Sequence, residues 1–145
     1  MKLSVGCDHG GLELKNKIVE HLHQLGHDVV DCGTYTNDSC DYPEFGHKAA
    51  TLVATKQVDF GIVVCTTGEG IMITANKVKG VRCAMGYCEE VAELTRLHND
   101  SNMIAFGQKF MDHDMVLRAV DKFITTPFEG GRHCRRVDLI KGFEE

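Results

Sequence analysis

Short apolar runs alternate with segments of helical pattern along the whole chain, and this alternation constrains the fold more than any other feature. Runs with the length of a buried strand occupy residues 3–7, 28–32, 60–64, 81–85 and 103–107. Helices are predicted over about residues 12–25, 44–56, 71–77, 89–97, 112–125 and 132–143. Strands that alternate with helices form βαβ units, and such units build a parallel sheet covered on both faces.

The predicted fold is therefore α/β, a Rossmann- or flavodoxin-like three-layer αβα sandwich with a five-stranded parallel sheet. With 145 residues we expect one domain over residues 1–145, in which residues 132–145 form a C-terminal helix or arm. A strand order such as 2-1-3-4-5 would place the ligand crevice beyond the carboxyl ends of the first and third strands. Those ends are followed by residues 8–11 and 65–70, which are polar and rich in glycine.

The charge and apolar patterns exclude several classes of protein. A formal net charge of −5 argues against a nucleic-acid partner. No apolar run approaches the ~20 residues that cross a bilayer, so no membrane association is expected. The first residues enter a strand pattern without the layout of a signal peptide, and we expect a cytoplasmic protein.

Seven cysteines are present, but their spacing does not indicate a disulfide framework or a zinc site. No CxxC pair occurs, and Cys83 and Cys88 have no second Cys or His pair nearby at a zinc-like spacing. Cys7, Cys32 and Cys65 each end a strand-like run, where a small buried hydrophobe is common. We expect no metal, and most of these thiols are predicted to serve packing.

The turn after the third predicted strand is the best candidate for chemistry. Cys65 stands before a glycine-rich turn and a helix start, where backbone amides and nearby hydroxyls can favour a thiolate. Thr67 could hydrogen-bond the sulfur or merely cap the helix. The turn lacks the third glycine of a dinucleotide fingerprint and the lysine of a P-loop, so no nucleotide cofactor is expected. The sequence of this turn is compatible with the binding of a smaller anion, and equally with a purely structural role.

Two further polar pairs lie at predicted strand ends. Asp8 and His9 follow the first strand and should face Cys65, where they could hold a hydroxyl and a phosphate, or simply cap a helix and face solvent. His98 and Asn99 precede the fifth strand, at the opposite end of the sheet. If they act with Cys65, they must come from a second subunit.

Arginines concentrate near the C-terminus. Arg132 and Arg136 are four residues apart and would share one face of a helix. Two guanidinium groups on one face can grip a phosphate dianion. The alternative is an ordinary solvated basic face.

Four segments together resemble the ribose-5-phosphate isomerase B family, which also includes the subunits of bacterial galactose-6-phosphate isomerase. They are VGCDHGGLELK at 5–15, YPEFG at 42–46, CTTGEGIMITANK at 65–77 and HN at 98–99. The resemblance extends over about residues 3–136. It implies a cofactor-free aldose–ketose isomerase that works as a homodimer or tetramer on a small-molecule sugar phosphate, with sites shared between subunits.

The resemblance also implies roles for individual residues. Cys65 would be the base that moves a proton between C2 and C1, and Thr67 would help to activate it. His98 would open the furanose ring, with Asp8 as its partner at the ring oxygen or the hydroxyls. A cis-enediolate needs preorganised donors. The amides expected to supply them are those of Gly68, Glu69 and Gly70. The other implied substrate contacts are Tyr42 and Asn99 to hydroxyls, and His9, Arg132, Arg136 and Lys109 to the phosphate.

Two residues depart from the family pattern. Thr66 stands where glycine is usual, and a β-branched residue there resists a positive φ. Glu69 stands where an aliphatic residue is usual, and its carboxylate could repel the substrate or replace Cys65 as the base.

The expected reaction interconverts D-ribose 5-phosphate and D-ribulose 5-phosphate through a cis-enediolate, in the pentose phosphate pathway or in a dedicated catabolic route. Isomerisation of a six- or four-carbon sugar phosphate is the first alternative, and a non-catalytic flavodoxin-like binding module is the second.

Overall fold

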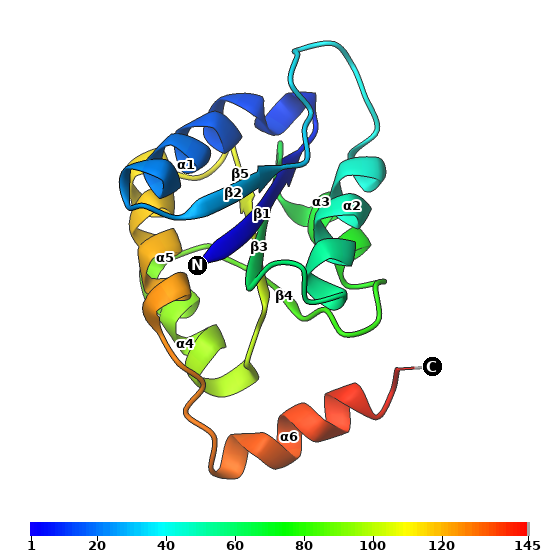
Figure 1. The fold of residues 1–145 in the computed structure, drawn as a ribbon, viewed down its shortest axis with the longest axis vertical. Coiled ribbons are helices and arrows are strands. Elements are labelled where there is room, and N and C mark those ends of the chain that lie inside the picture. Colours follow the sequence, from blue (N-terminus) through cyan, green and yellow to red (C-terminus); the bar gives the residue numbers. More distant parts are fainter. Residues whose placement is uncertain (145) are drawn as a thin grey trace.

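The computed structural model describes residues 1–144, which form a five-stranded sheet with six α-helices around it (Figure 1). The strands are β1 (Lys2–Cys7), β2 (Asp28–Asp31), β3 (Phe60–Cys65), β4 (Cys83–Met85) and β5 (Met103–Gly107). The helices are α1 (Leu12–Gln24), α2 (Tyr42–Ala54), α3 (Glu69–Ala75), α4 (Glu89–Asn99), α5 (His113–Thr125) and α6 (Arg132–Lys141). A 3₁₀ turn, His9–Gly11, links β1 to α1.

All neighbouring strands are parallel, which confirms the predicted fold class, but their order is β2-β1-β3-β5-β4. The expected order of the last two strands was therefore wrong. β5 is buried along its whole length and pairs with β3 over five residues, whereas β4 has three residues and occupies an edge. The strand predicted from residue 81 begins only at Cys83, because the amide of Arg82 donates to the side chain of Asn102.

Two apolar cores lie on the two faces of the sheet. One joins α1, α4 and α5 to side chains such as Val5, Ile62 and Phe106, all fully buried. The other joins α2 and α3 to the opposite face, including Val63 and Cys65. Alternate residues of a strand point to opposite faces, so both cores are drawn from the same central strands. Figure 1 shows the resulting three layers, with α6 apart from them.

Turn and capping residues set several helix ends, and α2 begins two residues earlier than the predicted start at residue 44. Gly26 has a φ of 85° and follows the end of α1, as expected of a glycine just beyond a helix. Pro43 lies in the first turn of α2, where its missing amide costs nothing. The carboxylate of Asp112 caps α5 by accepting from the amide of Met115.

A buried ion pair ties α1 to the end of β2. The ammonium of Lys15 lies 2.9 and 2.8 Å from the two carboxylate oxygens of Asp31, and the Lys15 side chain is only 1% exposed. Asp31 also accepts the amide of Gly33, so it holds the beginning of the loop that leads towards α2. Losing the lysine would leave a half-buried carboxylate without its counter-charge.

We therefore expect Lys15→Met to lower the free energy of unfolding by about 2–3 kcal/mol, less than for a fully buried pair because Asp31 keeps some contact with solvent. The control is Lys17→Met, which removes an exposed pair with Glu13 on the same helix and should cost no more than about 0.5 kcal/mol. Urea unfolding of both variants measures the difference. Equal losses would contradict a special role for the buried pair.

Candidate active site

The carboxyl edge of the sheet brings the first group of expected site residues together. In the β1–β3 register, Cys7 pairs with Val64, and in the β3–β5 register Cys65 pairs with Gly107. The segments that follow β1, β3 and β5 therefore leave the sheet side by side. They carry Asp8 and His9, the turn after Cys65, and Lys109.

Cys65 is buried, with 5% of its surface exposed, and its sulfur is oriented by the turn that follows it. The Sγ atom accepts a hydrogen bond from the amide of Gly68 at 3.1 Å. Gly68 has a φ of 84°, and a Cβ there would lie 2.9 Å from the carbonyl carbon of Phe106. Only glycine fits this position, so the glycine of the turn serves the orientation of the thiol.

Thr66 raised the question of whether the turn tolerates a β-branched residue. Among the non-glycine residues of 1–144, only Lys56 and Asp100 have a positive φ. Thr66 therefore occupies an ordinary backbone conformation, and the left-handed position falls on Gly68 instead. The departure from the family pattern does not strain the turn.

The first amides of α3 differ in their availability. The amide of Gly68 is used by Cys65, and the amide of Glu69 donates to the hydroxyl of Thr67 at 3.2 Å. Within residues 1–144, the amides of Gly70 and Ile71 donate to no protein acceptor. Of the amides expected to hold an oxyanion, Gly70 is thus free, and sequence reasoning missed its neighbour Ile71.

The side chains of Thr67 and Tyr42, both expected at the site, lie against the backbone of this turn. The hydroxyl of Thr67 caps the turn at Glu69, and no hydrogen bond joins it to Cys65 within the described chain. Tyr42 lies directly over the turn, because a Cβ on Gly70 would be 2.6 Å from its ring carbons. Glu69 itself is exposed in the first turn of α3.

Asp8 and His9 lie next to the same turn. Asp8 is 6% exposed and accepts a hydrogen bond from the amide of Gly10 at 3.0 Å. It therefore caps the 3₁₀ turn, as the capping alternative of the sequence analysis predicted. A Cβ on Gly10 would lie 2.1 Å from the Thr66 hydroxyl, which shows how closely the two loops approach.

The ring of His9 has one nitrogen fixed by the loop before α2. Nδ1 accepts the amide of Cys40 at 3.2 Å, so the ring proton of neutral His9 is on Nε2. That N–H belongs to an exposed side chain and can donate to an anion. Lys109 is also exposed at this edge, where its amide donates to the carbonyl of Thr66.

The second group of expected residues lies at the amino edge of the sheet. His98 and Asn99 are the last residues of α4, four residues before β5 begins at Met103. β5 is five residues long, so one strand length of about 16 Å separates this edge from the edge that carries Cys65. The structure thus confirms that one chain places His98 and Cys65 at opposite ends of the sheet.

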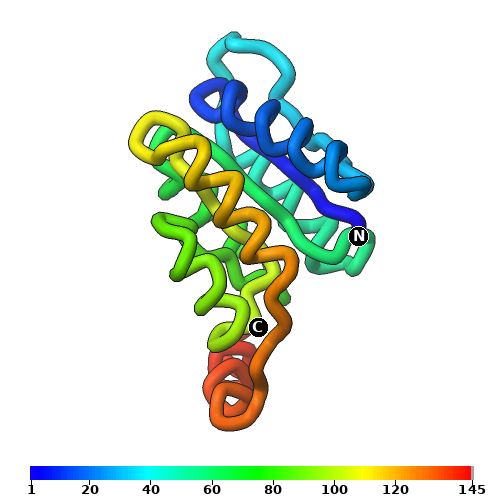
Figure 2. The backbone as a smooth tube through the Cα atoms, turned by 90° about the vertical axis from the view of Figure 1, so that its left-hand side faces the viewer, coloured from blue at the N-terminus to red at the C-terminus, as the bar shows by residue number. Residues whose placement is uncertain are grey.

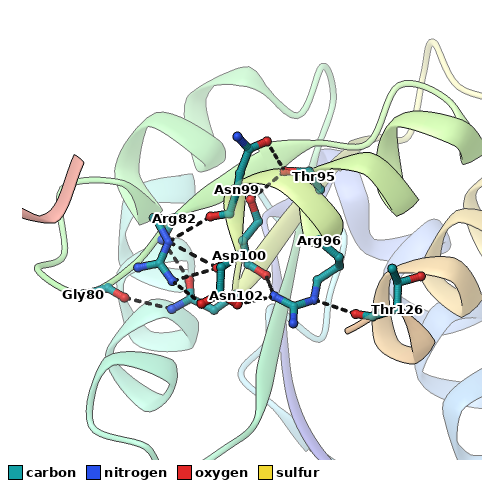
Figure 3. A network of polar contacts seen from close by, with 9 residues as sticks. Gly80, Arg82, Thr95, Arg96, Asn99, Asp100, Asn102 and Thr126 are labelled. Carbon is teal, nitrogen blue, oxygen red and sulfur yellow. Dashed lines mark hydrogen bonds and ion pairs between the residues drawn. The ribbon is translucent and has the colours of Figure 1, made fainter. Parts of the chain in front are cut away.

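A polar network holds the end of α4 in place (Figure 3). Arg96 is 6% exposed and donates to the carboxylate of Asp100 at 2.9 Å and to the carbonyl oxygens of Ser101 and Thr126 at 2.7 and 3.0 Å. Arg82 donates to the carbonyl oxygens of Asn99 and Asp100. The backbone carrying His98 and Asn99 is therefore anchored from both sides.

Helix α6 adds basic residues and an imidazole to this group. Arg132 and Arg136 are exposed on α6, whereas His133 is 5% exposed and stacks on His98 with ring centroids 4.4 Å apart. Burial, together with the neighbouring His98, lowers the pKa of His133. Its Nε2 atom has no hydrogen-bond partner among residues 1–144. In Figure 2 this helix projects beyond the layers of the sheet, at the lower end of the molecule.

Sequence reasoning missed Glu129, whose carboxylate faces both imidazoles from the loop before α6. Its signal was weak, namely a carboxylate just ahead of two glycines and an Arg-His pair. Gly130 and Gly131 both have a positive φ and turn the chain sharply into α6.

Three of the remaining cysteines, Cys7, Cys32 and Cys83, are buried packing residues. All seven are unpaired. Burial raises the pKa of Cys7 to about 12, and burial also raises the pKa values of Cys32 and Cys83. These three thiols therefore stay protonated at neutral pH and are poor nucleophiles.

No helix in the described part of the chain is long and apolar enough to span a membrane.

Comparison with known proteins gives one consistent family. The sequence model of the family described as "Ribose/Galactose Isomerase" matches residues 3–140. Ribose-5-phosphate isomerase B of Escherichia coli (strain K12) is 42% identical over 146 positions, covering 99% of this chain and 97% of that protein. The protein of the same name from Mycobacterium leprae (strain TN) is 43% identical, with coverage of 99% and 90%.

Solved structures agree in fold. Ribose-5-phosphate isomerase B of Clostridium thermocellum superimposes with a TM-score of 0.96 at 44% identity, covering 98% of this chain and 96% of that one. The Mycoplasma genitalium protein of the same name, crystallised with bound ribulose 5-phosphate, superimposes with a TM-score of 0.94 at 39% identity, with coverage of 98% and 95%.

Proposed function

The chain belongs to the ribose/galactose isomerase family, and we propose that it interconverts D-ribose 5-phosphate and D-ribulose 5-phosphate. The observation that carries this proposal is the Cys65 thiol, oriented by the Gly68 amide beside the two free amides of Gly70 and Ile71. A base next to preorganised donors is what proton transfer through an enediolate requires. The Mycoplasma genitalium relative with bound ribulose 5-phosphate supports the choice of a pentose phosphate.

In the proposed isomerisation, Cys65 as thiolate removes the C2 proton from the open-chain aldose. The electron pair moves through C1=C2, and O1 becomes an oxyanion held by the amides of Gly70 and Ile71. The proton of the C2 hydroxyl passes to O1 within the cis-enediolate, which moves the negative charge to O2, and the thiol then gives its proton to C1 as C2–O2 becomes the ketone. Thr67 supports the turn that carries the donors, and Tyr42, which lies over Gly70, contacts the sugar hydroxyls. The proposal uses no metal or cofactor.

Ring opening and phosphate binding complete the proposed reaction. His98 gives a proton to the ring oxygen, Asp8 contacts the sugar at the opposite side of the shared site, and Asn99 binds a hydroxyl. His9, through Nε2–H, Arg132 and Arg136 bind the phosphate dianion, which suits forked guanidinium donors. Lys109 adds a further cation at the carboxyl edge.

We further propose that the complete site forms between two subunits. Within one chain, about one strand length separates the Cys65 edge from the His98 edge. α6 projects away from its own sheet (Figure 2), and Leu139 and Ile140 on this helix and Phe143 just after it are exposed. Burial of this apolar surface against a second copy would favour the assembly. A homodimer satisfies these demands, and so does a tetramer built from such dimers.

The substrate is tested by measuring turnover on a panel of aldose phosphates. Ribose 5-phosphate should give the highest kcat/KM, above erythrose 4-phosphate, allose 6-phosphate and galactose 6-phosphate. Preference for a four- or six-carbon member would keep the chemistry and change the assigned substrate. No turnover on any member would contradict the enzyme and favour a flavodoxin-like binding module.

A further inference from the structure

Two imidazoles and one carboxylate meet where the loop before α6 crosses the end of α4. Nε2 of His98 lies 3.9 Å from a carboxylate oxygen of Glu129, and Nε2 of His133 lies 3.8 Å from the same oxygen. The two rings are stacked at 4.4 Å with an interplanar angle of 17°. These distances exceed a direct hydrogen bond but allow strong charge interactions.

Two hydrogen bonds to the backbone of the loop fix the position of Glu129 beside His98. The amide of Glu129 donates to the carbonyl oxygen of Leu97 at 3.1 Å, the residue just before His98. Three residues earlier, the carbonyl oxygen of Thr126 accepts from Arg96 at 3.0 Å, as Figure 3 shows. The loop is therefore attached twice to the last turns of α4, and Glu129 is held beside His98.

The same three side chains have the number and type of donors of a metal centre, with ligand atoms within 4.8 Å of one another. However, an imidazole binds a metal through a lone pair in its ring plane. A single ion cannot lie in both ring planes while the rings are stacked 4.4 Å apart. The observed arrangement is therefore one of charge and orientation, not of coordination.

The two histidines of this cluster differ in burial and in the charges around them. Burial and the proximity of His98 lower the pKa of His133, and Arg132 and Arg136 act in the same direction. Glu129 is the carboxylate that opposes them. The side chain of His133 is 7% exposed and that of His98 is 39% exposed, so Glu129 faces one buried ring and one partly solvated ring.

We propose that Glu129 is a positioning residue that holds the His98 ring in its orientation for ring opening, with His133 as the stacking support. The proposal rests on the isomerase function argued above. Glu129 then acts on the opening of the furanose ring and not on the proton transfer at Cys65. These two steps can be measured separately.

Ring opening alone is measured in a Cys65→Ala background, where the exchange between α- and β-ribose 5-phosphate is followed by NMR. Proton transfer alone is measured with Cys65 intact, as the exchange of the C1 hydrogen of ribulose 5-phosphate with D₂O. Ribulose 5-phosphate cannot form a furanose ring because its 5-oxygen carries the phosphate. We expect Glu129→Gln to slow the exchange between α- and β-ribose 5-phosphate about tenfold, which is less than the full rate gain of a general acid. The exchange of the C1 hydrogen should stay within about twofold of the wild-type rate.

The matched control is Glu93→Gln, which removes an exposed carboxylate on α4 that pairs with Lys122. It should leave both exchange rates unchanged. A parallel loss of both rates in Glu129→Gln would mean a structural or substrate-binding role and would overturn the proposal, as would no loss in either. Absence of C1 exchange in the wild-type protein would instead overturn the isomerase function, and this inference with it.

Discussion

Cys65→Ala is expected to lower kcat/KM for ribose 5-phosphate by about 10³-fold or more, at the upper part of the range for loss of a general base. The thiol is the group that the turn orients, through the 3.1 Å hydrogen bond from Gly68 to Sγ. Alanine removes the base but keeps the turn, because the strained position is the glycine and not the cysteine. Stability and substrate affinity should therefore change little. Steady-state kinetics, together with the KM of any residual activity, measure this effect.

The control variants separate a thiol base from a carboxylate base. Cys88→Ala, at the N-cap of α4, removes a half-buried thiol that forms no hydrogen bond to the rest of residues 1–144 and should leave the activity unchanged. Glu69→Ala should change kcat/KM by only a few-fold, since its exposed side chain affects the site through charge. A loss with Glu69→Ala and not with Cys65→Ala would transfer the role of the base to the carboxylate.

The fold could be predicted from the sequence because its signals are local. Apolar runs such as residues 60–64 and 103–107 are too short for buried helices, and residues 60–64 are also rich in β-branched side chains. The helices between such runs require parallel strands. Strand order could not be predicted in the same way. Strand order depends on how much apolar surface each strand buries in a central position. The three-residue β4 buries less than β5, so β5 lies next to β3 and β4 lies at the edge.

The geometry of the site was only partly predictable. The glycine turn and its cysteine follow from one continuous segment, and the strand order 2-1-3 suffices to place Asp8 beside it. The free amide of Ile71 depends on which neighbouring amides are already used, which no residue type reveals. The contact of Glu129 with His98 joins segments 31 residues apart, through a turn at two glycines with positive φ.

The sharing of the site between subunits can be tested by mixing two inactive variants. Cys65→Ala lacks the proposed base, and His98→Asn lacks the proposed acid, so each homodimer should have low activity. In a heterodimer of the two, one site combines both defects, and the other combines the intact Cys65 of one chain with the intact His98 of the other. Random mixing should therefore restore about a quarter of the wild-type activity, because half of the dimers are mixed and each has one intact site.

The physical reason for this expected recovery is the position of the two residues within one chain. Cys65 ends β3 at the carboxyl edge of the sheet, and His98 ends α4 at the amino edge, where Arg96 and Arg82 hold the backbone rigidly. A local movement cannot close a gap of about one five-residue strand. The two variants should be refolded together, and the heterodimer isolated through two different affinity tags should have about half of the wild-type activity. Wild-type chains carrying the same tags control for losses on refolding. If they recover and the mixed dimer stays inactive, the site is not shared in this way, and His98 acts elsewhere.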